Sequence, residues 1–162
     1  NIRQYKKEIL ILIPRHIERA NSINNEMKEK NLIMHRHSSY GKIRKDTDIY
    51  LVDTYGEAKK FLGLSKVIFT GGSIIPHGGQ NPLDAIRKNS LVMHGPNIEN
   101  FREIYKFLGN EKISFKINNL NQAVKLIKRQ KSNITNTKIK LNKISSKILV
   151  KTKSKILKYV WV

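Results

Sequence analysis

The 162-residue chain contains no cysteine, which excludes a disulfide framework, thiolate catalysis and cysteine-ligated zinc. It also lacks an apolar run near the roughly 18 residues that a membrane-spanning helix needs, since its longest such run is Ile9–Ile13. Hydrophobic residues nevertheless make up 39% and charged residues 27% of the chain, as in folded proteins. The sequence therefore predicts a globular domain rather than a disordered segment.

Acidic residues are scarce: 12 Asp and Glu stand against 32 Lys and Arg, so the formal net charge is +20. The last acidic residue is Glu111, and residues 112–162 contain 14 basic residues and no acid. Such a segment attracts nucleic acid or an anionic membrane surface. It also fits a general bias, because Lys, Ile and Asn make up 63 of the 162 residues. All three interpretations stay open. Aromatic residues on which bases could stack do not occur between the lysines, since Tyr159 and Trp161 come only at the end, and this weakens the nucleic-acid interpretation.

Short apolar runs alternate with segments of helical periodicity. The runs predict strands over Ile9–Ile13, Leu32–His35, Ile49–Val52, Val67–Thr70, Leu91–Met93 and Ile113–Phe115. The periodic segments predict helices over His16–Lys30, Tyr55–Leu64, Pro82–Lys88, Glu99–Leu108 and Leu120–Arg129. Gly109 is expected to end the fourth helix, and Val124 and Ile127 are expected to face inward from the fifth.

This alternation predicts a parallel sheet covered by helices on both faces. The expected fold is α/β, a doubly wound Rossmann-like domain over residues 1–130. Residues 131–162 are expected to form a Lys-rich extension, helical or disordered. Sheets of this kind bind ligands beyond the carboxyl ends of their strands, so the residues that follow each strand are the first candidates for a site.

The segment Gly71–Asp84 follows the fourth predicted strand and contains four of the chain's nine glycines. Glycines let backbone N–H groups approach an anion closely. Asn81 is a good N-cap and Pro82 suits the first helical position, so a helix N-terminus that attracts phosphate or carboxylate is expected here. Asp84 either closes a capping box or binds a pair of ribose hydroxyls. The segment is neither a P-loop nor a GxGxxG fingerprint.

Charged side chains follow two other predicted strands. Arg15 comes directly after the first, where it either clamps a phosphate or lies at the surface. Glu57 follows the third and either caps its helix or binds a ligand. His35 and His37 are the histidines closest together in the sequence; we expect them to face opposite sides of a strand, and they predict no metal site.

Four motifs in order carry a family resemblance: PRHIER from Pro14, VDTYGE from Val52, FTGGSIIPHGGQNPLD from Phe69 and HGPNIENF from His94. They resemble the 3-deoxy-D-manno-octulosonic acid (Kdo) transferase family over about Ile9–Ala123. The resemblance implies a glycosyltransferase of the GT-B architecture that transfers Kdo from CMP-Kdo to the lipid A precursor in lipopolysaccharide biosynthesis. It implies that this chain is the carboxyl-terminal, nucleotide-sugar-binding domain.

The resemblance also implies roles for single residues. Arg15 would contact the CMP phosphate or the Kdo carboxylate, and Asp84, where the family usually has Glu, would contact the ribose. The chain departs from the family pattern at Tyr55, Gln80 and Ser90, which replace Met, His and Pro. The other implied donor-binding residues form three groups: Thr54, Tyr55, Gly56 and Glu57; Gly71, Gly72 and Ser73; and Gly78, Gly79 and Asn81.

The family's amino-terminal domain carries the membrane anchor, the acceptor site and the catalytic base, and we expect it to be absent from this chain, which starts at Asn1. The resemblance therefore implies no catalytic residue, no metal and no cofactor here. The implied partners are CMP-Kdo, the lipid A precursor, an anionic membrane surface and a separate chain that supplies the other domain. The implied location is the cytoplasmic face of the inner membrane.

On its own, such a chain is expected to bind the donor without turnover. One alternative is a basic protein that binds nucleic acid or anionic surfaces through the Lys-rich segment, with a steep salt dependence that is lost when the segment is deleted. Another is a GT-B donor domain that uses a UDP-sugar, which nucleotide preference would reveal.

Overall fold

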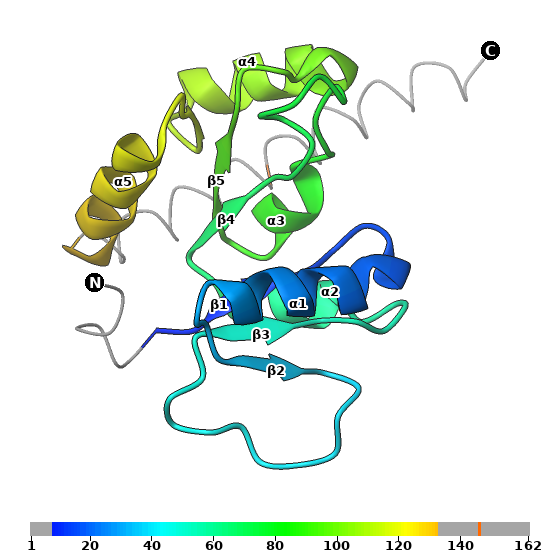
Figure 1. Cartoon of the computed structure of the whole chain (residues 1–162). Helices are drawn as coiled ribbons and strands as arrows, with labels where there is room; N and C mark the ends of the chain where they lie inside the picture. The colour runs from blue at the N-terminus through cyan, green and yellow to red at the C-terminus, as the bar shows by residue number, and fades with distance from the viewer. Residues whose placement is uncertain (1–7, 133–145, 147–162) are drawn as a thin grey trace. The chain divides into compact units, whose positions relative to one another are not determined.

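The computed structural model describes residues 8–132 and residue 146. The chain divides into two compact units, Asn1–Phe61 and Leu62–Val162 (Figure 1). Among the described residues, each unit has one sheet of three parallel strands. All six predicted strands are present, each with bounds within two residues of those expected. The α/β class is therefore confirmed, with the strands hydrogen-bonded in two sheets of three.

In the first unit the strand order is β1-β3-β2. The strand bounds are Leu10–Leu12 for β1, Met34–Arg36 for β2 and Ile49–Leu51 for β3. The helices are the short 3-10 helix η2 at Ile17–Arg19, α1 at Ala20–Glu29 and α2 at Ala58–Leu62, whose last residue belongs to the second unit. Helix α1 lies along one face of the sheet because its apolar residues recur three and four positions apart. The contacts that form this core involve Ala20, Ile23 and Met27 of the helix and Leu12, Met34 and Leu51 of the strands.

In the second unit the strand order is β4-β5-β6. The bounds are Val67–Phe69 for β4, Leu91–His94 for β5 and Ser114–Lys116 for β6, with α3 at Leu83–Arg87, the 3-10 helix η3 at Glu99–Phe101, α4 at Arg102–Asn110 and α5 at Leu120–Ser132. All four residues of the central strand β5 are buried. Its Leu91 and Val92 pack with Tyr105 and Leu108 of α4, which makes β5 the centre of the larger core.

All five expected helices are present with shifted bounds, and α4 and α5 differ from the expectation in further details. Helix α4 runs past Gly109 to Asn110, and the chain turns at Lys112, which takes the left-handed φ of +58°. In α5 the residue that faces the core is Ala123, while Val124 is 40% exposed, so the expectation for Val124 was wrong. Ile127 packs partly against this core as expected. The extension predicted for residues 131–162 lies outside the described residues except for 131, 132 and 146.

A close approach between the ends of β4 and β5 requires glycine at position 95. A Cβ atom at Gly95 would lie 2.2 Å from the backbone oxygen of Ser73 and 2.5 Å from its carbonyl carbon. Real Cβ atoms do not come so close to backbone atoms, so any side chain here must push the two segments apart. Gly63 is a matched comparison, because a Cβ there would meet nothing nearer than the side chain of Lys88 at 3.8 Å.

We therefore predict that Gly95→Ala lowers the free energy of unfolding by about 2–4 kcal/mol. The measurement is denaturant unfolding of the full chain, followed by circular dichroism. Gly63→Ala should change the free energy of unfolding by less than about 1 kcal/mol. Equal effects of the two substitutions would show that the approach of Ser73 to Gly95 does not constrain the fold.

Candidate functional site

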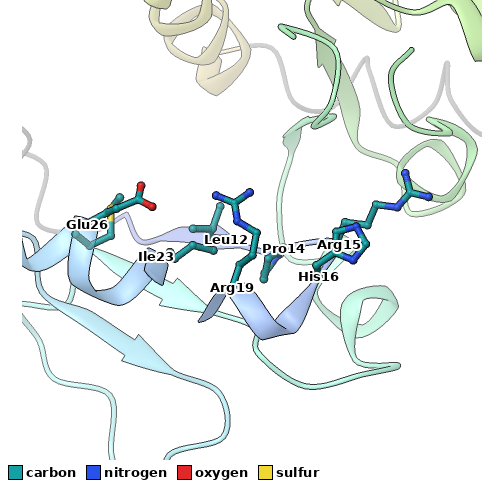
Figure 2. A pocket seen from close by; sticks show the side chains of 8 residues that line it. Leu12, Pro14, Arg15, His16, Arg19, Ile23 and Glu26 are labelled. Carbon is teal, nitrogen blue, oxygen red and sulfur yellow. The ribbon is translucent and has the colours of Figure 1, made fainter. Parts of the chain in front are cut away.

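A cleft of about 280 Å³ opens in the first unit where the chain leaves β1 (Figure 2). Its apolar floor comes from the same α1 and β1 residues that build the core, and its polar groups follow the turn at Pro14. The lining residues are Leu12, Pro14, Arg15, His16, Arg19, Ile23, Glu26 and Met27. Arg15, predicted from its position after the first strand, thus lies in a hollow rather than on a flat surface.

The charges in this cleft are largely unneutralised. Arg15 and Arg19 are exposed, and neither forms an ion pair or hydrogen bond through its side chain with the residues that the structure describes. The carboxylate of Glu26 accepts a hydrogen bond from the hydroxyl of Ser22 at 3.2 Å. Two guanidinium groups without a protein carboxylate to bind are suited to an anion, because arginine binds phosphate and carboxylate in a bidentate manner.

The carboxylate of Asp53 joins the ends of β3 and β2. It accepts hydrogen bonds from the Ser38 backbone N–H at 2.9 Å, the Ser38 hydroxyl at 2.6 Å and the Arg36 Nε at 2.7 Å. Its side chain is 1% exposed. Burial raises the pKa of Asp53, but the hydrogen bonds from Ser38 and Arg36 and the charge of Arg36 outweigh it, so the pKa lies below its ordinary value. Asp53 therefore has a structural role beside the predicted site.

The next residues, Thr54–Glu57, reach the segment that lines the cleft. Tyr55 donates a hydrogen bond to the carboxylate of Glu18, which lowers the pKa of Glu18 and raises that of Tyr55. Thr54 Oγ1 is buried and has no hydrogen-bond partner among the described residues. Gly56 adopts a φ of +80°, which a residue with a side chain rarely takes. This arrangement brings Thr54 and Tyr55 to the same edge of the sheet as Arg15.

Glu57 belongs to a cluster that the sequence did not reveal. Its carboxylate lies 2.7 Å from Lys60 Nζ and 3.9 Å from Nε2 of His37, whose Nδ1 lies 2.7 Å from the hydroxyl of Tyr50. The ring of His37 also meets Phe61 edge to face at 5.1 Å. These contacts come from β3, α2 and the end of β2, so no single segment of the sequence signals them.

His35 stacks on the same ring of Tyr50 at 5.4 Å, and His37 contacts it at 5.8 Å. The two histidines therefore face the same side, and our expectation of opposite sides was wrong. The physical reason is that side chains two residues apart along a strand point to one face. No group of three or more potential metal ligands occurs within residues 8–132 or at 146.

In the second unit, the glycine-rich segment folds back on itself after β4. The buried hydroxyl of Ser73 donates to the Thr70 carbonyl at 2.6 Å and accepts from the Gly95 N–H at 2.9 Å. The N–H of Gly79 donates to the Gly72 carbonyl at 3.0 Å and closes the loop. Gly72, like Gly78 and Gly79, has a φ between +67° and +75°, so three of the predicted glycines are needed for the course of the backbone.

The HGPNIEN segment after β5 holds this loop in place. Asn97 donates its side-chain N–H to the Ile74 carbonyl at 2.8 Å, and the Asn100 backbone N–H donates to the Gly78 carbonyl at 3.2 Å. From α4, the hydroxyl of Tyr105 donates to the Gln80 carbonyl at 2.8 Å. Sequence reasoning used this segment only as a motif and missed its supporting role, because all of these pairs are more than twenty residues apart.

The end of the loop forms the start of α3. Asn81 accepts the Leu83 N–H at 3.0 Å. The helix begins at Leu83 and its N-cap is Pro82, so the expectation of Asn81 as the N-cap and Pro82 as the first helical residue was wrong by one position. Asp84 is about half exposed and lies 3.3 Å from the guanidinium of Arg87. In a capping box the Asn81 backbone N–H would donate to the Asp84 carboxylate, and this hydrogen bond is not among those formed by the described residues. The Asp84 carboxylate therefore remains accessible from solvent.

Comparisons with known proteins identify relatives. The chain is 34% identical to the 3-deoxy-D-manno-octulosonic acid transferase of Haemophilus influenzae over 107 residues, which is 66% of this chain and 25% of that protein. It is 32% identical over 130 residues to a bifunctional glycosyltransferase/methyltransferase of Fusobacterium nucleatum, covering 77% of this chain and 20% of that protein. No protein-family model matches the chain.

A solved structure is similar to a larger share of this chain than the two relatives above. The C-terminal CMP-Kdo binding domain of WaaA from Acinetobacter baumannii superposes with a TM-score of 0.81 and 29% identity, covering 88% of this chain and 76% of that domain. The chain is a homologue of the Kdo transferases. It corresponds to their carboxyl-terminal domain and spans about a quarter or less of the length of the two curated relatives described above.

The Kdo transferase resemblance read from four motifs is thereby confirmed, and so is the GT-B type of fold. A nucleic-acid-binding protein is not favoured. None of the described helices combines the length and the apolar character needed to cross a membrane. The four motifs contain two kinds of side chain. Arg15 and Asp84 are accessible from solvent, whereas Asp53 and Ser73 are buried and hold the backbone by hydrogen bonds.

Because the buried carboxylate of Asp53 accepts hydrogen bonds from Ser38 and Arg36, we predict that the stability of the first unit depends on pH. Asp53→Asn should lower the free energy of unfolding by about 2 kcal/mol at pH 7, because charge-assisted hydrogen bonds from Ser38 and Arg36 are lost. The folded-state pKa of Asp53 is lowered, so its stabilisation is complete above the unfolded value of about 3.9 and disappears as the pH falls through the folded value.

Urea unfolding at a series of pH values from 7 downward measures this difference. The stabilities of the original chain and Asp53→Asn should converge in acid. Asp46→Asn is the control, since Asp46 pairs with Arg44 at an exposed position, and it should have little effect. A difference between the original chain and Asp53→Asn that stays constant with pH would contradict a lowered pKa.

Proposed function

We propose that this chain binds CMP-Kdo and acts as the donor-binding half of a Kdo transferase. The observation that carries the proposal is its similarity, over 88% of its length, to a domain described as binding CMP-Kdo. The complete enzyme would break the bond between the anomeric carbon of Kdo and the phosphate and form one to a hydroxyl of the lipid A precursor. CMP leaves, and the hydroxyl proton passes to a base of the amino-terminal domain.

Within the first unit, we propose that the cationic cleft binds the phosphate of the donor. Arg15 lines a cleft and has no ion-pair partner among the described residues, so it is free to bind the phosphate of CMP. Negative charge grows on this phosphate as the glycosidic bond breaks, and a fixed guanidinium stabilises it. Thr54 at the same sheet edge has a buried hydroxyl that finds no partner among the residues that the structure describes, which suits a hydrogen bond to the donor.

Within the second unit, we propose that the glycine-rich loop binds the nucleotide. Gly71, Gly72 and Ser73 begin this loop, and Gly78, Gly79 and Asn81 end it. Its backbone is held by Ser73 and by contacts from the segment after β5, which gives a ligand a preorganised surface. The accessible carboxylate of Asp84 would accept hydrogen bonds from the hydroxyls of the ribose. Tyr55, Gly56 and Glu57 are the further donor-binding residues proposed within the first unit.

The acceptor, the membrane and the remaining domain enter the proposal as partners. The donor half would work with an amino-terminal domain, in the same or a separate polypeptide, that supplies the catalytic base. The lipid A precursor lies in a membrane, so the proposed place of action is the cytoplasmic face of the inner membrane. The net charge of +20 would favour an anionic lipid surface.

We predict that CMP raises the midpoint of thermal unfolding of the full chain and that UMP does not. A ligand at 100 times its Kd stabilises the native state by about 2.7 kcal/mol, which corresponds to roughly 5–10 °C for a domain of this size. Arg15→Ala should remove most of this shift, because the phosphate loses its guanidinium partner. Differential scanning fluorimetry with millimolar nucleotide gives the measurement.

Arg44→Ala is the matched control, because Arg44 is exposed in the same unit and pairs only with Asp46 among the interactions described for it. It removes the same charge away from the cleft and should keep the response to CMP. A shift with UMP equal to that with CMP would point to a UDP-sugar donor. A cooperative transition that neither nucleotide moves would overturn donor binding by this chain.

A further inference from the structure

The cleft of the first unit contains one cation more than the phosphate of CMP requires. Arg15 and Arg19 both line it, and both lack an ion-pair partner among the described residues. Two guanidinium groups that line one hollow both attract a ligand with negative charge. The second arginine therefore needs an explanation that Arg15 alone does not provide.

The proposed donor carries two anionic groups, and the inference rests on that proposed function. Linked to Kdo, the phosphate of CMP is a diester with one negative charge. Kdo is a keto acid, so its anomeric carbon bears both the phosphate oxygen and the carboxylate carbon. The two anions are thus separated by only a few bonds, at the carbon where the reaction takes place.

The cleft presents its charged groups in an order that matches this arrangement. Arg19, Ile23, Glu26 and Met27 share one helix face, because they are spaced by four, seven and eight residues. Seven residues of helix place Glu26 about 10 Å along the axis from Arg19. In Figure 2, Arg19 stands between Arg15 and Glu26. The lining therefore runs from a cation through a second cation to a carboxylate.

We infer that Arg19 binds the carboxylate of the donor sugar while Arg15 binds the phosphate, so that Arg19 selects a CMP-linked keto acid over CMP alone. Glu26 at the far end repels a second anion and accepts hydrogen bonds from hydroxyl groups, as it does from Ser22. A donor with its carboxylate at Arg19 and its hydroxyls toward Glu26 satisfies all three side chains.

The composition of the chain supports the same assignment. Lysine outnumbers arginine by 24 to 8, yet both of the long cationic side chains that line this cleft are arginines. A planar guanidinium binds both oxygens of a carboxylate at once, whereas an ammonium group acts as a point charge. Arginine, the rarer of the two basic residues in this chain, therefore lines the cleft, where bidentate binding of a carboxylate is useful.

The test compares the binding of freshly prepared CMP-Kdo and of CMP to the full chain by titration calorimetry. Arg19→Gln should weaken CMP-Kdo about tenfold or more, because a charge-assisted hydrogen-bonded pair is lost, and should change CMP binding by less than about threefold. Arg15→Gln should weaken both ligands. Arg19→Lys, which keeps the charge and loses the bidentate geometry, should fall between the original chain and Arg19→Gln for CMP-Kdo.

Lys28→Gln is the matched control, since Lys28 is exposed on the same helix and does not line the cleft. It removes the same charge and should leave both affinities close to the original. Equal weakening of CMP and CMP-Kdo by Arg19→Gln, or no change in either, would overturn the assignment of Arg19. If the original chain binds neither ligand, the proposed function itself fails, which is a different result.

Discussion

Backbone groups that leave a parallel sheet at its carboxyl edge lose their strand partners and must find others, and this constraint shapes the candidate site. In each unit one buried polar side chain accepts a hydrogen bond from such a backbone N–H group. Asp53 takes the Ser38 N–H that follows β2, and Ser73 takes the Gly95 N–H that follows β5. Both side chains are almost fully buried, so their hydrogen bonds are protected from water.

Fixing the backbone in this way separates residues that hold the site from residues that are free to act. Asp53 has its carboxylate oxygens occupied by three donors and cannot serve a ligand. Arg15 and Arg19 have no such partners among the described residues, and Thr54 keeps a buried hydroxyl without one. Neighbouring residues of one motif therefore have different roles: Asp53 holds the backbone, whereas the Thr54 hydroxyl remains available to a ligand. A motif as a whole does not tell which of its members touches a ligand.

The sequence predicted the features that short segments determine. Apolar runs such as Leu91–Met93 located the strands, because parallel strands are buried on both faces. It did not predict contacts between distant segments, for example Tyr105 with Gln80 or His37 with Tyr50. Such pairs depend on which side chains the topology brings together, and no local pattern encodes that.

Recognition of the proposed donor involves two separate physical problems. CMP and UMP carry the same phosphate, so no arginine in the cleft can distinguish them. The two bases differ at one exocyclic position, where cytosine has an amino donor and uracil has a carbonyl acceptor. A hydrogen-bond acceptor at a fixed point can discriminate between them, and backbone carbonyls of a firmly held loop are acceptors of that kind.

The glycine-rich loop is held firmly by Ser73, Asn97 and Tyr105, while the arginines lie on another element of the chain. The preference for one base would depend on the rigidity of this loop, and the preference for a sugar acid would depend on the charges of the cleft. A substitution in the cleft should then alter affinity for the acid without altering the preference for cytosine. The two selectivities would be separable because their physical causes lie in different residues.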